Sequence, residues 1–237
     1  MSKYYFLSDM HLGNRNQDDL KEKRFISFLK QLPVDTAGLY LLGDIFDYWL
    51  EYKTVIFLQF FNVLSELKNV LGRGIKIYFV VGNHDFAAGN FFKKCLPIEI
   101  FYGPVSVELN GLRVFLHHGD GISPRDVGYR RLKRFLRYPL TKSVLRLIHP
   151  DFAIYLMHLL SGCSHIYTDK INHGEKEAIF DMAKQKLGAG YDAIICGHSH
   201  EPVSKDGYYN LGDWQEYFTY LYLEDKEFSL RKFECPI

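Results

Sequence analysis

Residues 78–85 read Tyr78-Phe79-Val80-Val81-Gly82-Asn83-His84-Asp85, so four residues that favour β-strand run directly into a glycine and three polar side chains. Four other strand-like runs end in the same kind of polar segment. These segments are Ser8-Asp9-Met10-His11, Gly43-Asp44-Ile45-Phe46-Asp47, His117-His118-Gly119-Asp120 and Gly197-His198-Ser199-His200. Helical stretches near 18–31 and 54–71 separate the first three runs, which predicts β-α-β units around a buried parallel sheet. Because sites in such sheets lie beyond the carboxyl ends of the strands, we expect the five loops to meet at one edge.

The chain after residue 97 has a different pattern. Residues 105–109 and 113–117 are strand-like and flank the turn Asn110-Gly111, which predicts a β-hairpin and a second, more antiparallel sheet. Further strand-like runs occur at 193–196, 208–211, 219–223 and 228–233.

A helical segment is expected between the hairpin and the later strands. Ser123-Pro124-Arg125-Asp126 favours a helix start, with serine as the cap and proline at the first helical position. Two or three short helices should follow, before another helix near 173–187. We therefore expect one domain over residues 1–237, with a helical lid inserted at about 123–170.

The composition is that of a single α/β enzyme domain. At 237 residues, with 47% apolar and 16% aromatic residues, the chain can bury one sizeable core. The four cysteines form no C-x-x-C pair and no apolar signal sequence precedes the first strand-like run, so we expect a cytoplasmic protein. No apolar run reaches the roughly 18 to 20 residues needed to span a bilayer. Any contact with the inner membrane should therefore be peripheral, on its cytoplasmic face.

The polar side chains at the strand ends are those that bind divalent cations in catalytic sites. Carboxylate, amide oxygen and imidazole together suit Mn²⁺ and similar ions, whereas the lack of clustered cysteines argues against a structural zinc or iron–sulfur site. Taken singly, each motif is ambiguous: Asp-x-His is more often an ordinary loop, and Gly-Asp-x-x-Asp is commonly a turn with a helix cap. Five such motifs in this order, all at strand ends, favour a centre with two catalytic metals.

The calcineurin-like metallophosphoesterases have a signature that this sequence resembles over almost its whole length. The matching segments are Asp9-x-His11, Gly43-Asp44-x-x-Asp47, Gly82-Asn83-His84-Asp85, His118 and Gly197-His198-x-His200. The resemblance implies an α/β sandwich of two mixed β-sheets flanked by helices. It also implies that two divalent ions, Mn²⁺ for preference, are held by Asp9, His11, Asp44 and His200 on one side and by Asp44, Asn83, His118 and His198 on the other. Asp44 would bridge the two ions.

The same resemblance implies how the reaction runs. Two cations at such a centre lower the pKa of a shared water and bind the phosphoryl oxygens during in-line displacement. His84 would be an outer-sphere group that protonates the leaving oxygen or stabilises its charge. Asp85 would orient the His84 ring. We therefore expect a metal-dependent hydrolase of phosphate esters or anhydrides.

Positive charge is concentrated in the expected insertion. The formal charge of the chain is +1, but residues 125–146 carry eight Lys or Arg and one acid, so this segment is +7 and the remainder is −6. Residues 151–160 are apolar nearly all round. A basic and apolar lid beside a phosphoesterase centre suits an amphiphile with a phosphate head and acyl tails. The alternative is that the basic residues form a solvated helix face and that the apolar run packs on the main domain.

The layout around the insertion resembles the UDP-2,3-diacylglucosamine hydrolases of lipid A biosynthesis. The matching segments are His118-Gly119-Asp120, Asp126-Val127-Gly128-Tyr129, Gly197-His198-Ser199-His200-Glu201-Pro202 and Leu211-Gly212-Asp213-Trp214. Those enzymes cleave the pyrophosphate of their substrate to give UMP and 2,3-diacylglucosamine 1-phosphate, and the lid would hold the acyl chains. The resemblance implies substrate contacts at Asn83, Asp126, Ser164 and His198. One departure is His84, because the best-known members have arginine there and histidine is the form found in general metallophosphoesterases.

Three other functions must be distinguished from this one. A hydrolase of soluble nucleotides or of other phosphate esters would work without detergent and would not need the apolar lid. A metal-bound but inactive interaction module is disfavoured, because every expected ligand and His84 are present. Nucleic-acid binding by the basic stretch is disfavoured as well, since its interleaved Leu and Phe fit packing better than stacking on bases. The expected partner is therefore a phosphorylated glycolipid or nucleotide-sugar lipid, met at a membrane surface.

Overall fold

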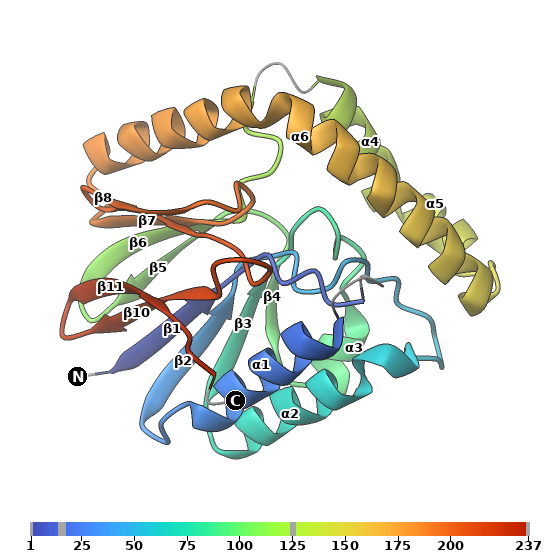
Figure 1. Cartoon of the computed structure of the whole chain (residues 1–237), viewed down its shortest axis with the longest axis horizontal. Coiled ribbons are helices and arrows are strands. Elements are labelled where there is room, and N and C mark those ends of the chain that lie inside the picture. The colour runs from blue at the N-terminus through green and yellow to red at the C-terminus, as the bar shows by residue number, and fades with distance from the viewer. Residues whose placement is uncertain (1, 14–17, 124–126, 236–237) are drawn as a thin grey trace.

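The computed structural model describes residues 2–13, 18–123 and 127–235, without the side chains at positions 18, 19, 127, 129, 132, 139 and 157–173. Two mixed β-sheets lie face to face, and helices cover the outer face of each (Figure 1). The layers are therefore helix, sheet, sheet and helix, which confirms the expected fold class.

The six-stranded sheet contains the strands that lead to the first three polar loops. In spatial order they are β11 (Glu227–Lys232), β10 (Thr219–Glu224), β1 (Lys3–Leu7), β2 (Thr36–Leu41), β3 (Lys76–Val80) and β4 (Glu99–Phe101). β1 to β4 run parallel, and β10 and β11 add antiparallel strands beside β1. Leu7 pairs with Leu41, and Leu41 with Phe79, so β1, β2 and β3 end level with one another.

The five-stranded sheet supplies the other two polar loops. In spatial order it contains β5 (Val105–Leu109), β6 (Leu112–His117), β7 (Ala193–Cys196), β9 (Tyr208–Leu211) and β8 (Pro202–Lys205). β5 and β6 form the expected hairpin, but β6, β7 and β9 are parallel, so this sheet is mixed rather than largely antiparallel. His117 pairs with Cys196, which starts the next two loops at the same edge.

Two helices cover the outer face of the six-stranded sheet (Figure 1). They are α1 (Asp18–Gln31), as expected, and α2 (Phe61–Gly72), which follows the short 3-10 helix η1 (Leu58–Phe60). The second helix therefore begins later than the expected residue 54. Phe57 and Phe60 pack against Tyr48, with ring centroids 5.6 and 5.8 Å from it, so the residues before η1 are held as a loop. The sequence did not indicate the short α3 (Asn90–Lys94), β4 or β8.

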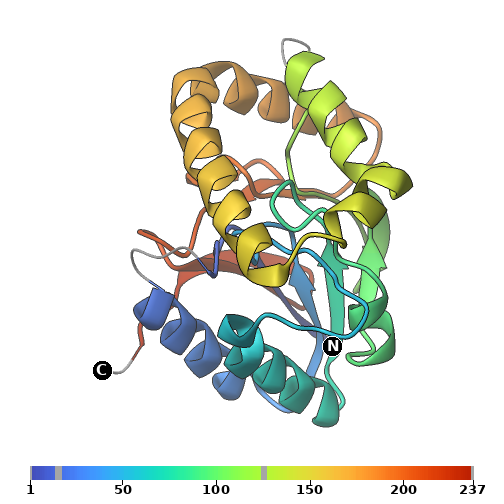
Figure 2. The same cartoon turned by 90° about the vertical axis from the view of Figure 1, so that its right-hand side faces the viewer.

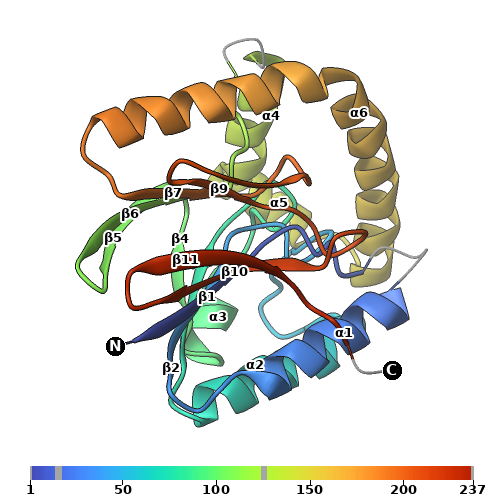
Figure 3. The same ribbon diagram turned by 60° about the vertical axis from the view of Figure 1, so that its left-hand side comes forward.

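The insertion is built from α4 (Val127–Arg137), α5 (Pro139–Leu145) and the first part of α6 (Pro150–Gly188). Separate helices after residue 150 and near 173–187 were expected; that prediction is wrong, because α6 continues through both. The intervening sequence, residues 161–172, has one glycine and no proline, and a helix tolerates a glycine at a cost of about 1 kcal/mol. Figure 3 shows two arms of α6 in different directions, with the C-terminal arm over the five-stranded sheet. Figure 2 shows the other arm grouped with α4 and α5.

Three buried apolar clusters hold the layers together. The first lies between the six-stranded sheet and its helices and includes Phe25 and Leu29 of α1. The second lies between the two sheets and includes Phe6 and Leu116. In the third, Ile179 of α6 packs on the five-stranded sheet. Burying side chains of this size stabilises the fold by roughly 1.5–3 kcal/mol each.

Several large apolar side chains of the insertion are exposed instead. They are Phe135, Tyr138, Leu140, Val144, Leu147, Phe152 and Tyr155. A gathering of exposed apolar residues commonly marks a binding surface. Among the residues that the structure describes, no helix has both the length and the apolar character needed to cross a membrane.

Candidate metal centre

The five polar loops meet where the strands of the two sheets end. They contribute Asp9 and His11 after β1, Asp44 after β2, Asn83 and His84 after β3, His118 after β6, and His198 and His200 after β7. Three compact groups of possible ligand atoms arise there, each with all its atoms within 4.8 Å of one another. Two of them share no residue: the first is Asp9, His11 and His200, and the second is Asp44, His118 and His198. The remaining group, His11, Asp44 and His84, shares one residue with each of these two.

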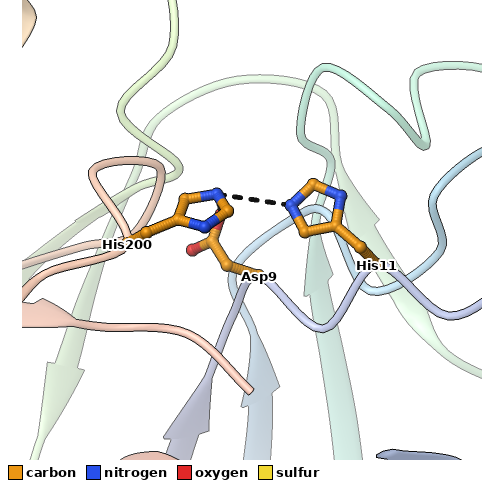
Figure 4. A group of neighbouring side chains, drawn as sticks. All are labelled: Asp9, His11 and His200. Carbon is orange, nitrogen blue, oxygen red and sulfur yellow. Dashed lines mark hydrogen bonds and ion pairs between the residues drawn. The ribbon is translucent and has the colours of Figure 1, made fainter. Parts of the chain in front are cut away.

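The first group brings two histidine rings against one carboxylate (Figure 4). The Nε2 atoms of His11 and His200 are 3.4 Å apart, and Nε2 of His200 is 3.6 Å from Oδ1 of Asp9. Oδ1 of Asp9 is fully buried and accepts no hydrogen bond from any described residue. A buried carboxylate oxygen of this kind is costly unless a cation or a donor satisfies it. The donor set, one carboxylate and two imidazoles, fits a divalent metal ion.

The second group is arranged around His118. Its Nδ1–H donates to the main-chain oxygen of Leu42 at 2.8 Å, which turns Nε2 toward the other ligands. Nε2 lies 3.3 Å from Oδ2 of Asp44 and 3.0 Å from Oδ1 of Asn83. A histidine that donates its second ring N–H to a backbone carbonyl is the usual arrangement for a metal ligand. These residues therefore also fit a divalent cation.

Asp44 lies between the two groups. Its Oδ2 is 3.9 Å from Nε2 of His11 in one group and 3.3 Å from Nε2 of His118 in the other. Its Oδ1 accepts the backbone N–H of His84 at 2.9 Å, which fixes the orientation of the carboxylate. Asp44 is thus placed as a bridging ligand would be.

The backbone is strained at the same residues. Ten non-glycine residues in the described part of the chain have positive φ, and five of them are candidate ligands. These five are Asp9, His11, Asp44, His198 and His200, with φ between 47° and 67°. This region is unfavourable for residues with a Cβ, and such strain gathers at functional sites. The local sequence therefore adopts these turns only because the packed sheets hold them.

Two carboxylates that the sequence reasoning gave no role lie behind the first group. Oδ1 of Asp47 is 3.4 Å from Nδ1 of His11, and Oδ2 of Asp213 is 3.4 Å from Nδ1 of His200. A carboxylate at the outer nitrogen of a ligating histidine orients the ring and raises its basicity. Asp47 could have been found from the Gly43-Asp44-x-x-Asp47 spacing.

Asp213→Asn should weaken cation binding by about 10- to 100-fold. Oδ1 of Asp213 accepts backbone N–H groups from residues 215–217, and an amide oxygen can keep those bonds. The amide group would replace only the oxygen that faces His200. Mn²⁺ titration followed by electron paramagnetic resonance checks this, with Asp181→Asn on an exposed face of α6 as the control. Unchanged affinity in Asp213→Asn would mean that the carboxylate does not support His200.

The structure places His84 and Asp85 differently from the expected pair. Nδ1–H of His84 donates to the main-chain oxygen of Asp47 at 2.8 Å. Both carboxylate oxygens of Asp85 accept backbone N–H groups instead, from Gly82 at 2.7 Å and from Ile45 at 3.0 Å. Asp47 therefore orients the His84 ring, and Asp85 acts further out by joining the loops after β2 and β3.

Burial and the neighbouring charges set the protonation of the centre. Burial lowers the pKa of His11 to about 4. Burial acts in the same direction on His118, but the Asp44 carboxylate outweighs it and raises the pKa of His118 to about 10. Although burial opposes it, His118 in turn holds the pKa of Asp44 well below its usual range. Burial, with Asp44 nearby, raises the pKa of Asp85 to about 7. Asp44 therefore keeps its negative charge between the two groups.

An open pocket of about 360 Å³ lies over the centre. Its lining includes His11, Asp44, Asn83, His84, His198 and His200, together with Lys176 of α6. Asn83 and His198, expected to contact substrate, therefore do line it. Asp126 lies outside the described residues, and the side chain of Ser164 lies outside them as well.

Several basic residues of the insertion are used to fasten it to the loops at the strand ends. Arg137 donates to the main-chain oxygen of Gly82 at 3.2 Å, and Arg146 to that of Glu51 at 2.7 Å. Lys133 pairs with the buried Asp120. Part of the positive charge of this segment is therefore bound to acceptors within the protein. The expectation that the whole segment forms a solvated or lipid-facing charge is corrected to that extent.

Fold and site together define a metal-dependent phosphoesterase. The chain belongs to the calcineurin-like phosphoesterase family, whose sequence profile matches residues 2–202. It is 30% identical to a UDP-2,3-diacylglucosamine hydrolase from Porphyromonas gingivalis, over 92% of this chain and 93% of that protein. A protein of the same name from Pseudomonas aeruginosa is 31% identical, over 88% of this chain and 90% of its own length. A dimetal phosphatase from Danio rerio has a similar fold, with a TM-score of 0.51 at 12% identity over 97% of this chain and 95% of that one.

Proposed function

We propose that this hydrolase cleaves the pyrophosphate bond of UDP-2,3-diacylglucosamine, giving UMP and 2,3-diacylglucosamine 1-phosphate. The observation that carries the chemistry is the pair of ligand groups that meet at Asp44. The substrate is inferred from the names of relatives that match nearly the whole chain, and from the exposed apolar residues of the insertion.

We propose that the centre holds two divalent cations, Mn²⁺ for preference. Asp9, His11 and His200 would hold one ion, and Asn83, His118 and His198 the other, with Asp44 shared. When bound, two such ions lower the pKa of a water molecule and neutralise the phosphoryl oxygens. Because the Asp47 contact commits Nδ1 of His84 to the protein, proton transfer to the leaving oxygen would run through Nε2 of His84.

The test is Mn²⁺-dependent release of UMP from UDP-2,3-diacylglucosamine in mixed micelles, beside a panel of soluble nucleotides and phosphate diesters. Asp44→Asn serves as the inactive control. Release that this variant lacks supports the proposal. Turnover of the soluble panel alone would contradict the lipid substrate while leaving the metal chemistry in place. The histidine at position 84 favours this second function, hydrolysis of soluble nucleotides or other phosphate esters, since the best-known lipid A hydrolases carry arginine at the corresponding position.

The exposed apolar residues should matter for a lipid substrate only. Leu147, in the turn between α5 and α6, is 86% exposed, and Leu58 of η1 is equally exposed outside the insertion. If Leu147 contacts the lipid, Leu147→Ser should raise KM for the micellar substrate about tenfold, as expected for loss of one buried leucine. Leu58→Ser should not change it. A rise in KM for soluble diesters as well would show that the substitution damages the fold instead.

A further inference from the structure

Two neighbouring side chains of α6 reach the loop after β7. Oε2 of Glu175 is 3.4 Å from Nε2 of His198, and Nζ of Lys176 donates to Oε2 of Glu201 at 2.7 Å. Both contacts are made in the C-terminal arm of α6, which is continuous with the helix of the insertion. The helix that carries part of the lid therefore touches the metal-binding loop directly.

Glu175 faces one ring nitrogen of His198, whose side chain is expected to bind a cation. Nε2 of His198 is buried and makes no hydrogen bond to any described residue. The side chain of Glu175 is itself only 15% exposed. A largely buried carboxylate is unfavourable unless positive charge lies close to it. A cation bound at His198 would therefore stabilise the Glu175 carboxylate beside it.

Glu175 is not part of the compact ligand set itself. The set within 4.8 Å contains Asp44, His118 and His198, and Glu175 lies beside its outer member. We propose, resting on the proposed two-cation centre, that Glu175 is a positioning residue for the cation at this group. Its carboxylate holds the His198 ring and adds negative charge at the edge of the site.

This assignment couples the cation to the helix. If packing of α6 against the loop after β7 strengthens cation binding, the bound cation must stabilise that packing by the same factor. The reason is that coupling between two equilibria is reciprocal. Loss of the Glu175 charge should therefore weaken cation binding, and it should also remove the stabilising effect of the cation on α6.

The experiment is Mn²⁺ titration of Glu175→Gln, without substrate, followed by electron paramagnetic resonance. Glutamine keeps the shape and removes the charge, so one of two Mn²⁺ equivalents should bind about 10- to 100-fold more weakly. Mn²⁺ should slow amide hydrogen exchange in the C-terminal arm of α6 in the wild type and not in Glu175→Gln. Glu175→Asp, which keeps the charge, should recover part of the affinity.

Two controls separate this effect from the alternatives. Glu177→Gln removes an exposed carboxylate of the same helix and should bind Mn²⁺ like the wild type. Lys176→Gln breaks the other contact of α6 with the loop but keeps Glu175. The proposal is overturned if Glu175→Gln binds both Mn²⁺ ions with wild-type affinity. It is also overturned if Lys176→Gln weakens Mn²⁺ binding as much as Glu175→Gln does. A wrong substrate leaves these measurements unaffected, whereas fewer than two Mn²⁺ in the wild type would contradict the proposed centre itself.

Discussion

Asp44→Asn should lower kcat/KM for any phosphoester substrate by at least about 10³-fold. Asp44 lies within contact distance of both His11 and His118, so the change removes one negative charge that the two ligand groups share. Mn²⁺ binding should fall from two equivalents to at most one tight equivalent. Steady-state kinetics and Mn²⁺ titration check the two effects independently.

The substitution is chosen to leave the fold intact. Asp44 has φ 53°, and asparagine tolerates this region nearly as well as aspartate does. An amide oxygen can also keep the bond from the backbone N–H of His84. Asp206→Asn is the matched control, because Asp206 has φ 48° in an exposed turn far along the chain. Retention of normal activity in Asp44→Asn would show that this carboxylate does not bridge a catalytic centre.

The candidate ligands could be predicted from the sequence because they are set by local pattern. Each follows a short run of strand-forming residues, and strands that pair level with one another deliver their next residues to the same place. Leu7, Leu41 and Phe79 are paired in this way, which brings Asp9, Asp44 and the Asn83 loop together.

What the sequence did not predict depends on packing between distant segments. Nothing local indicates that Glu175 lies against His198, because the contact requires α6 to run as one helix over the five-stranded sheet. Similarly, Asp213 faces His200 only because the loop after β9 returns to the strand ends. The role of Asp85 was misread for the same reason: its nearest neighbour in sequence is His84, but its partners are backbone groups of Gly82 and Ile45.

Gly82→Ala should lower kcat/KM by about 100-fold, the cost expected when reacting groups are displaced by about 1 Å. A Cβ at residue 82 would lie 2.2 Å from Oδ1 of Asp44 and 2.7 Å from its backbone nitrogen. Rotation of the Asp44 side chain cannot relieve the second contact, so the two loops must move apart. Overpacking of this kind also costs about 1–3 kcal/mol of stability, which denaturant unfolding would measure. Gly103→Ala is the control, because a Cβ there meets nothing within 4 Å.

A second glycine distinguishes loss of the shared ligand from loss of one ion. A Cβ at Gly197 would lie 2.4 Å from Oδ2 of Asp9, a ligand of the first group only. Gly82→Ala should therefore weaken the binding of both Mn²⁺ equivalents, because it displaces Asp44. Gly197→Ala should chiefly weaken the binding of one equivalent. If both variants lose the same single equivalent, Asp44 serves one ion, and the bridging arrangement inferred from its distances to His11 and His118 is wrong.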